Sequence, residues 1–229
     1  MLSRIVNTLY AAADHPVLVA STVASNYDIF ELQLFEKGLI ASLIVSLLNS
    51  GQVNTLELTE AVSIILCNLS TLPSHIEWLV FEANILVVLH GLWNFCPHSA
   101  KIGCLLALCV RNLSSSYRVC HTMAEQRAFV LTGQILETYS SNSETLCRLA
   151  IYTIKNFARD DGLHELLLDE NAIEILQLVV FRSPEGIESL TPNPMLTGID
   201  VFNTVRCIDL IATSPQCREG LITKGAVQL

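Results

Sequence analysis

The chain has 229 residues, of which 51 % are hydrophobic and only 15 % are charged, a composition that excludes a disordered chain and supplies a continuous core. Its formal charge of −9, from 13 Lys and Arg against 22 Asp and Glu, disfavours nucleic acid as a partner, because a duplex requires a dense cationic footprint. Leucine is abundant while glycine (10) and aromatic residues (7 %) are sparse, which favours helices over sheets.

The N-terminal segment Met1–Ala13 lacks the long apolar core of a signal peptide. The most apolar run, Leu39–Leu48, is about half the length that a membrane span needs, so we expect no membrane insertion. Eight cysteines are scattered without the spacing of a disulfide framework, which indicates small buried side chains in a reducing compartment. We therefore expect a cytoplasmic protein, with a nuclear, cytoskeletal or ciliary location left open.

Helical patterns follow one another along the chain. Apolar residues recur at three- and four-residue steps over residues 58–69 and again over residues 146–157, which predicts an amphipathic helix in each segment. Turn residues separate such helices at positions 49–51, 95–97 and 140–142. The whole chain, 1–229, therefore reads as one array of short helices.

Three of these helices end in the same way, with an asparagine, a large apolar residue and a small residue. The asparagines Asn68, Asn112 and Asn156 follow one another at intervals of 44 residues. A new apolar helix is expected to begin fifteen residues after each of them, at Ala83, Arg127 and Asn171. Glycines begin the corresponding helices at both ends of the array, Gly38 on the N-terminal side and Gly225 on the C-terminal side.

The last interval, from Asn171 to Gly225, is 54 residues and thus ten longer than the others. Three prolines, Pro184, Pro192 and Pro194, lie within eleven residues of this interval. Proline removes an amide donor and disfavours helix in the preceding residue. We therefore predict a loop insertion at 182–198, between two helices, because the stacked core of a repeat array cannot absorb extra residues.

A period of 40–47 residues with two or three helices is typical of HEAT and armadillo arrays. The motifs Asn68-Leu69-Ser70, Asn112-Leu113-Ser114 and Asn156-Phe157-Ala158 resemble the end of the third helix of the armadillo repeat family. This resemblance implies an all-α fold: a right-handed α-solenoid of three-helix repeats, with about five units that are incomplete at both ends.

The chain departs from the family pattern in two respects. Ala83, Arg127 and Asn171 stand where the family has glycine. Val23 in the first unit and Leu210 in the last stand where the asparagine is expected, so the asparagine series has three members.

In the armadillo family the asparagines of the third helices line a concave groove and bond the backbone of an extended peptide. The resemblance therefore implies a peptide-binding groove containing Asn68, Asn112 and Asn156. An amide side chain is suited to this role because it offers both a donor and an acceptor. The alternative interpretation is that these asparagines cap helix ends or bridge neighbouring helices.

Helical geometry at 100° per residue places further side chains on the same flank as the asparagines. These are Arg111, Arg148, Tyr152, Lys155, Arg159 and Arg206. Their charge predicts a cationic groove for an acidic or phosphorylated segment of a partner protein. The alternative is a set of solvated charges, some of them paired with Asp160, Asp161 or Asp209.

Two other binding modes are alternatives to this groove. Importin-α-like receptors for basic segments carry tryptophan four residues before the asparagine, where this chain has Ile64, Leu108 and Tyr152. A structural scaffold of the cytoskeleton or axoneme would use the convex face, the ends or the 182–198 loop instead. The chain reaches only about five residues into its last predicted helix. We therefore expect an open repeat end, which a longer protein, a partner or self-association would cover.

Nothing in the sequence indicates an enzyme. It contains no GxSxG, HExxH or CxxC motif and no phosphate-binding glycine loop, so no catalytic residue or cofactor is predicted. The nearest approach to a metal site, Cys96 and His98 with Cys104, lacks paired short spacing, and no metal is predicted. Asp161 is expected to cap the helix that follows it.

Overall fold

The computed structural model describes residues 56–95, 98–139, 143–182 and 191–226, and the described chain is all-α, as predicted. The helices are α5 (Leu56–Ser70), α6 (Pro73–Phe81), α7 (Ile85–Phe95), α8 (Ala100–Leu113), α9 (Tyr117–Glu125), α10 (Ala128–Tyr139), α11 (Glu144–Phe157), α12 (His164–Asp169), α13 (Ala172–Val180), α14 (Gly198–Ala212) and α15 (Pro215–Thr223). A 3-10 turn, Asp161–Leu163, precedes α12. Two-residue strands, β1 (Phe181–Arg182) and β2 (Thr191–Pro192), pair antiparallel.

Helices of similar length recur in a fixed order. The long helices α5, α8, α11 and α14 have 14 or 15 residues and begin at Leu56, Ala100, Glu144 and Gly198. These starts are spaced like the predicted landmarks, by 44, 44 and then 54 residues. The ten extra residues fall between α13 and α14, around the β1–β2 pair. Residues 183–190 of that insertion lie outside the described residues, as do Val23, Gly38 and Cys96.

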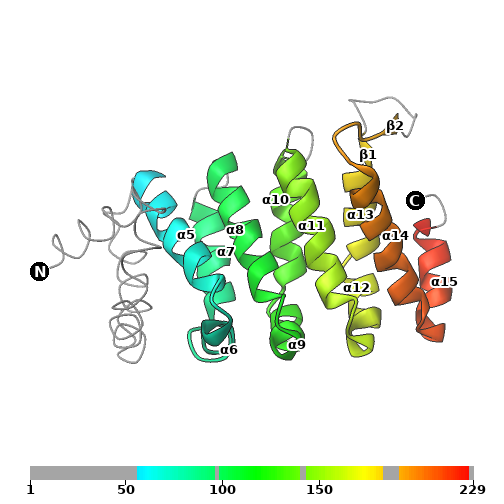
Figure 1. Cartoon of the computed structure of the whole chain (residues 1–229), viewed down its shortest axis with the longest axis horizontal. Coiled ribbons are helices and arrows are strands. Elements are labelled where there is room, and N and C mark those ends of the chain that lie inside the picture. Colours follow the sequence, from blue (N-terminus) through cyan, green and yellow to red (C-terminus); the bar gives the residue numbers. More distant parts are fainter. Residues whose placement is uncertain (1–55, 96–97, 140–142, 183–190, 227–229) are drawn as a thin grey trace, which may run out of the picture.

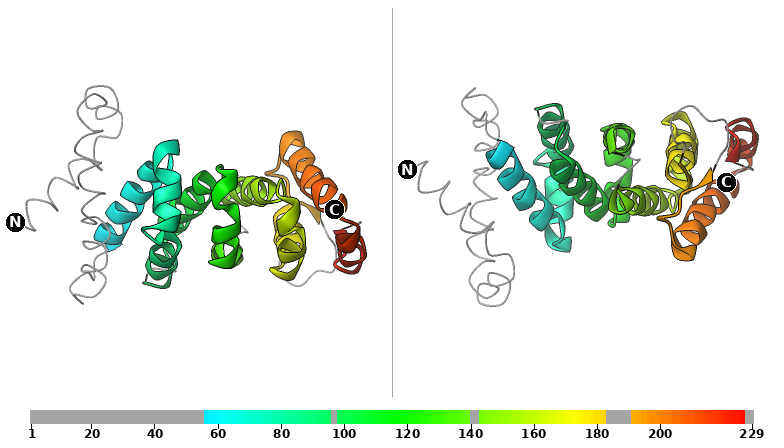
Figure 2. Two further views of the ribbon diagram at one scale, coloured as in Figure 1. Left: turned by 90° about the horizontal axis from the view of Figure 1, so that it is seen from below. Right: turned by 90° about the horizontal axis from the view of Figure 1, so that it is seen from above.

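The helices stand side by side in a row along the long axis of the molecule (Figure 1). Each long helix packs chiefly against the long helices before and after it, α5 against α8, α8 against α11 and α11 against α14. The shorter helices pack behind them in the same order, for example α6 against α9 and α12 against α15, and Figure 2 shows the row from two further sides.

One continuous core runs through the row, from Val62 in α5 to Ala226 after α15. Its largest fully buried side chains include Phe129 of α10 and Phe157 of α11, whose ring centroids lie 4.3 Å apart at a tilt of 57°. Burying such a side chain contributes about 1.5–3 kcal/mol. Gly103 lets α8 approach α7 and α10 closely, because a Cβ there would lie 3.2 Å from Ile135 and 3.4 Å from Trp93.

Equivalent residues cap equivalent helices. The Ser99 hydroxyl accepts a hydrogen bond from the Ile102 amide at the start of α8, and the Ser143 hydroxyl accepts one from the Leu146 amide at the start of α11. The prediction that Asp161 caps the helix after α11 is wrong. The Asp160 carboxylate is the cap, because it accepts the Gly162 amide hydrogen bond at 3.1 Å.

Four residues adopt the left-handed backbone conformation immediately before a helix or after one. They are Asn84 (φ 49°), Arg127 (φ 63°), Asn171 (φ 63°) and Gly225 (φ 75°). Three of these are landmarks that the sequence located, whereas Ala83 is wrong by one residue. Asparagine and glycine tolerate this conformation, but for most other residues it costs about 1–2 kcal/mol. Of these four positions, Arg127 therefore carries the residue least suited to a left-handed backbone conformation.

Replacing Arg127 with glycine should relieve this strain. We expect Arg127→Gly to unfold with a free energy about 0.5–1 kcal/mol higher than Arg127→Ala, because both variants remove the same exposed side chain and only glycine accepts φ 63° freely. Urea denaturation followed by circular dichroism measures the difference. Gly225→Ala is the converse control and should lower stability. An Arg127→Gly protein less stable than Arg127→Ala would contradict this account.

Among the described residues no single helix combines the length and the hydropathy of a membrane span. The adjoining segments Val62–Ser70 and Pro73–Phe81 meet those criteria only together, as a pair bent by 118°.

Candidate functional site

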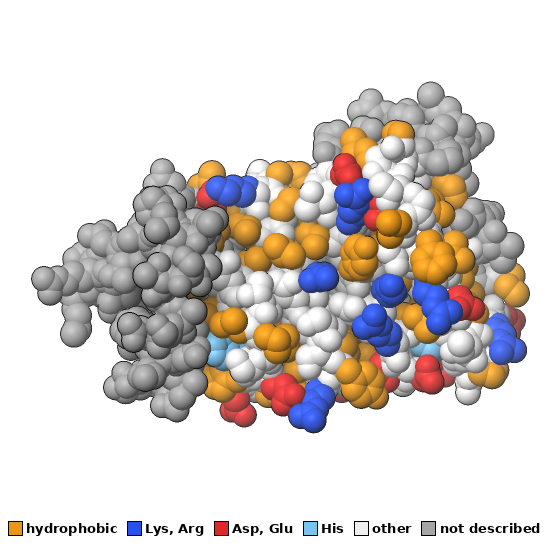
Figure 3. All heavy atoms as spheres, in the orientation of Figure 1, with side chains coloured by type: hydrophobic (Ala, Val, Ile, Leu, Met, Phe, Trp, Pro, Cys, Tyr) orange, Lys and Arg blue, Asp and Glu red, His pale blue; other side chains and the backbone are white. Residues whose placement is uncertain are grey.

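The predicted site residues lie on or directly after the long helices, which lie side by side on the face seen in Figure 1. Asn68 belongs to α5, Arg111 and Asn112 to α8, Arg148, Tyr152, Lys155 and Asn156 to α11, and Arg206 to α14, while Arg159 follows α11. Figure 3 shows Lys and Arg side chains gathered over the α11 and α14 half of this face. The structure therefore places the predicted residues along one row of helices.

The asparagines Asn112 and Asn156 bridge neighbouring long helices. Asn112 Nδ2 donates to the Ser70 hydroxyl at 3.1 Å, and that hydroxyl donates to the Cys67 carbonyl at 2.6 Å. In the next pair of helices, Asn156 Nδ2 donates to the Ser114 hydroxyl at 3.0 Å. This is the bridging arrangement that the sequence left open as an alternative to peptide binding.

The bridges explain why asparagine and serine occur together in the motif. Each serine stands two residues after an asparagine and accepts from the asparagine of the following long helix. A spacing of 44 residues therefore keeps donor and acceptor opposite each other. The series stops after α11, because Ala158 lacks the hydroxyl and Leu210 lacks the amide.

The asparagines differ in how much of the side chain remains accessible. Asn112 is 7 % exposed and its Oδ1 accepts a hydrogen bond from Arg111 Nη1 at 3.1 Å. Asn156 is half-buried, and its Oδ1 accepts no hydrogen bond from any described residue. Asn68 is exposed. Accessible amide groups thus remain at Asn68 and Asn156, while Asn112 is mostly occupied within the fold.

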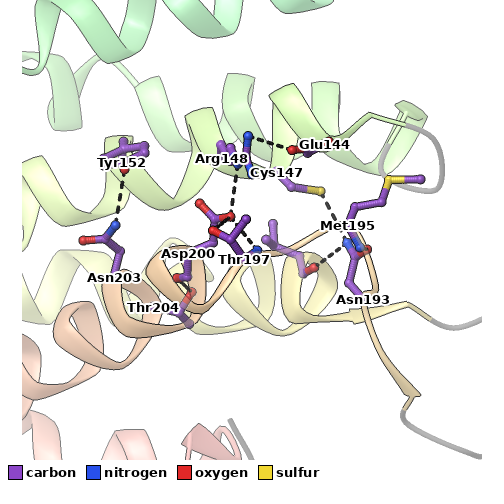
Figure 4. Close-up of polar contacts among 11 residues, drawn as sticks. Glu144, Cys147, Arg148, Tyr152, Asn193, Met195, Thr197, Asp200, Asn203 and Thr204 are labelled. Atoms are coloured by element: carbon purple, nitrogen blue, oxygen red, sulfur yellow. Dashed lines mark hydrogen bonds and ion pairs between the residues drawn. The ribbon is translucent and has the colours of Figure 1, made fainter.

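The contact between α11 and α14 is built around the carboxylate of Asp200 (Figure 4). Its Oδ2 accepts from the Thr197 amide at 2.8 Å, from the Thr197 hydroxyl at 2.7 Å and from Arg148 Nε at 3.0 Å. Burial alone would raise the pKa of Asp200, but these hydrogen bonds and the Arg148 charge together hold it below its usual value. Arg148 Nη1 also lies 2.6 Å from Glu144 Oε1, so two carboxylates compensate its charge.

A second polar contact between the same helices involves Asn203, which is buried. Lys155 Nζ donates to the Asn203 Oδ1 at 2.7 Å. The Asn203 Nδ2 donates to the Tyr152 hydroxyl at 3.4 Å (Figure 4). Tyr152 and Lys155 therefore help to position α14 as well as lying on the predicted face.

The segment that leads into α14 is also fixed. Asn193 Nδ2 donates to the Val179 carbonyl at 3.0 Å, and Asn193 Oδ1 accepts from the Met195 amide at 3.1 Å (Figure 4). Sequence reasoning missed Asn193, Asp200 and Asn203. The one signal for them was the capping box of Thr197 and Asp200, a threonine followed three residues later by an acid.

Three of the five predicted cations form no ion pair with any described residue. Arg206 is paired with Asp209, as one alternative foresaw, and Arg148 is paired with Glu144 and Asp200. Arg111, Lys155 and Arg159 remain, and we call these three residues the cationic positions. Arg111 and Lys155 are equivalent residues on adjacent long helices, and Arg159 follows Lys155 by four residues, just after the end of α11.

Most of the described cysteines are buried, and the described residues include no cluster of metal ligands. They contain no group of three or more His, Cys, Asp or Glu side chains that could hold a metal ion. Burial raises the pKa of the Cys109 and Cys207 thiols to about 12 and that of Cys120 to about 11. These thiols stay protonated at neutral pH, which removes the thiolate that nucleophilic or metal chemistry needs.

A scan against protein-family models and searches of curated proteins and of solved structures found no match. The armadillo resemblance therefore rests on the motifs and their spacing.

The lowered pKa of Asp200 predicts how the stability contributed by this residue changes with pH. A carboxylate whose pKa is lower in the folded state stabilises the fold above its unfolded pKa of about 3.9, and this contribution is lost as the pH falls through the folded value. We expect Asp200→Asn to lower the free energy of unfolding by about 1–3 kcal/mol at pH 7 and by progressively less below about pH 4. Urea denaturation at pH 7, 5 and 3 measures the change.

Asp209→Asn is the matched control, because Asp209 is exposed and its pair with Arg206 should contribute less than about 1 kcal/mol. A destabilisation by Asp200→Asn that does not depend on pH, or an equal effect of Asp209→Asn, would contradict the role assigned to Asp200.

Proposed function

We propose that the chain is a right-handed armadillo-type α-solenoid that binds an extended segment of another protein along the face of its long helices. Three features support the architecture: a recurring order of three helices, a 44-residue spacing of long helices and motifs alike, and one core through the row. The proposed function is non-enzymatic.

The observation that carries the binding proposal is the set of cationic positions on an acidic protein. Arg111, Lys155 and Arg159 form no ion pair with the described residues, although the chain has nine more acidic than basic side chains. Each hydrogen bond to an ionised ligand group would contribute about 1.5–3 kcal/mol. The partner segment in this proposal is therefore acidic or phosphorylated, and a basic segment is disfavoured.

The accessible amides would fix the direction of the bound segment. In this proposal Asn68 and Asn156 bond the peptide backbone, while Asn112 serves chiefly as a bridge between α5 and α8. Each backbone hydrogen bond would contribute about 0.5–1.5 kcal/mol, so the cations must supply most of the selectivity.

The structure also shows which variants test binding without disturbing the fold. Asn112, Arg148 and Lys155 are unsuitable, because their side chains bond Ser70, Asp200 and Asn203 within the fold. Arg159 is exposed and forms no hydrogen bond or ion pair with the described residues, so Arg159→Glu changes the ligand-facing charge more directly. Arg118→Glu is the matched control, since Arg118 lies on α9, is exposed and, among the described residues, forms an ion pair with the surface residue Glu77 alone.

Fluorescence anisotropy with two labelled peptides tests the proposal. The probes are an extended Glu/Gly peptide and a peptide of the same length that contains phosphoserine. We expect the wild-type chain to bind at least one of them, more weakly at higher salt, and Arg159→Glu to bind at least tenfold more weakly. A tenfold change corresponds to about 1.4 kcal/mol.

Three results would contradict the proposal. They are binding of neither probe, an equal loss of peptide affinity in Arg118→Glu, and tighter binding of a Lys/Gly peptide of the same length. Circular dichroism of each variant verifies that the helices are retained.

A further inference from the structure

The cation that precedes each bridging asparagine behaves differently on α8 and on α11. On α8, Arg111 Nη1 donates to the Oδ1 of the next residue, Asn112, at 3.1 Å. On α11 the equivalent cation, Lys155, extends to the following long helix, where its Nζ donates to the Asn203 Oδ1 at 2.7 Å. The Oδ1 of Asn156 accepts no hydrogen bond from any described residue. One asparagine acceptor is therefore occupied by the neighbouring cation and the other is open.

This difference coincides with a change of residue on the following long helix. Because α14 begins 54 residues after α11, Asn203 on α14 occupies the position that Leu149 has on α11. The Leu149 side chain is packed against the core and offers no acceptor to Arg111. Asn203 is buried, and its amide bonds both Lys155 and the Tyr152 hydroxyl of α11 (Figure 4). The polar residue on α14 thus gives Lys155 a partner that Arg111 lacks.

Lys155 and Asn156 reach toward opposite neighbours of α11. The Asn156 amide reaches back to α8, since its Nδ2 donates to the Ser114 hydroxyl at 3.0 Å, whereas Lys155 reaches forward to α14. A lysine ammonium carries three donors on a flexible stem. Without a partner on α14, Lys155 would be free to bond the Oδ1 of Asn156, as Arg111 bonds that of the residue after it.

We infer that Asn203 is a positioning residue for the proposed peptide-binding face: by holding Lys155, it keeps the acceptor of Asn156 open for a backbone N–H of the bound segment. Asn203 itself is buried in the contact between α11 and α14, so it acts through Lys155 and not by touching the segment. This inference rests on the proposed function and adds to it the residue that decides which asparagine acceptor is available.

The variant Asn203→Leu tests this role, because it places on α14 the residue that α11 has at the equivalent position. We expect Lys155 to turn to the Asn156 Oδ1 in this variant. The probes are the acidic peptide that the wild-type chain binds more tightly and a set of the same peptide in which one glycine at a time is sarcosine. Sarcosine has no amide hydrogen, so it removes one backbone donor at a known position.

Fluorescence anisotropy of the full chain measures the affinity for each peptide. In the wild type, sarcosine at one or more positions should weaken binding about threefold to tenfold, the effect of one backbone hydrogen bond. In Asn203→Leu, the parent peptide should bind about threefold to tenfold more weakly, and sarcosine should have no effect at one of the positions sensitive in the wild type. Asn203→Leu/Lys155→Met should restore that sensitivity, because methionine has no donor to occupy Asn156.

Thr204→Val is the matched control. Thr204 is buried on the same helix, and its hydroxyl donates to the Asp200 carbonyl at 3.0 Å, so the variant removes a buried polar group of α14 without releasing Lys155. Its sarcosine sensitivity should equal that of the wild type. Circular dichroism verifies that every variant retains its helices.

A sensitive position that Asn203→Leu abolishes and the double variant restores supports the inference. It is overturned by a wild type with no sensitive position, by equal sensitivity in Asn203→Leu, by a loss that Lys155→Met does not restore, by the same loss in Thr204→Val, or by an Asn203→Leu protein that no longer binds the parent peptide. If the wild type binds no acidic peptide, the proposed function fails as well. If it binds one and Arg159→Glu weakens that binding, these results overturn the role of Asn203 alone.

Discussion

The long helices of this protein are buried on more than one side, and each of them depends on the next for that burial. In α8, for example, Leu106, Val110 and Leu113 are fully buried. Four helices contact α8 and cover these side chains: α5, α7, α10 and α11. No group of three helices could cover such a helix alone, so stability comes from the contacts between neighbouring groups. The continuous core, the asparagine–serine bridges and the fixed spacing all follow from this docking of one long helix on another.

The sequence revealed this arrangement because the docking contact reuses the same residues. Asn112 and Asn156 each donate a hydrogen bond to a serine on the preceding long helix. Because this contact recurs with every repeat, asparagine and serine recur every 44 residues, and the helix order was predicted from that recurrence. The sequence could not decide whether the amides bridge helices or bind a peptide, because an amide has donors and an acceptor for either role. Asp200 was missed because its partner Arg148 lies 52 residues away and the motif is absent from α14. The start of α7 was predicted one residue too early, at Ala83 instead of Asn84, because either residue could end the turn before the helix.

Charge compensation was only partly visible in the sequence, which offered pairing with Asp209 as an alternative but did not indicate the Arg148–Asp200 pair. Arg148 and Arg206 carry the same charge as the cationic positions, but only the fold shows that nearby carboxylates compensate both of them. The remaining cations lie on or directly after α8 and α11, on the face of the long helices, whereas the large exposed apolar side chains are most numerous on α14.

We interpret the 44-residue period as the spacing that places each long helix in the same packing position against the one before it. Duplicating residues 106–149 inserts 44 residues with the junction in the middle of a long helix, and the helix phase is preserved. Duplicating residues 106–147 inserts 42 residues and turns the junction helix by about 200°, which directs its buried residues outward. Thermal unfolding followed by far-ultraviolet circular dichroism compares the two proteins. We expect the 44-residue duplication to unfold cooperatively and to keep its helicity per residue. The 42-residue duplication should lose both the cooperative transition and part of its helicity. Equal unfolding behaviour of the two proteins would contradict this interpretation of the period.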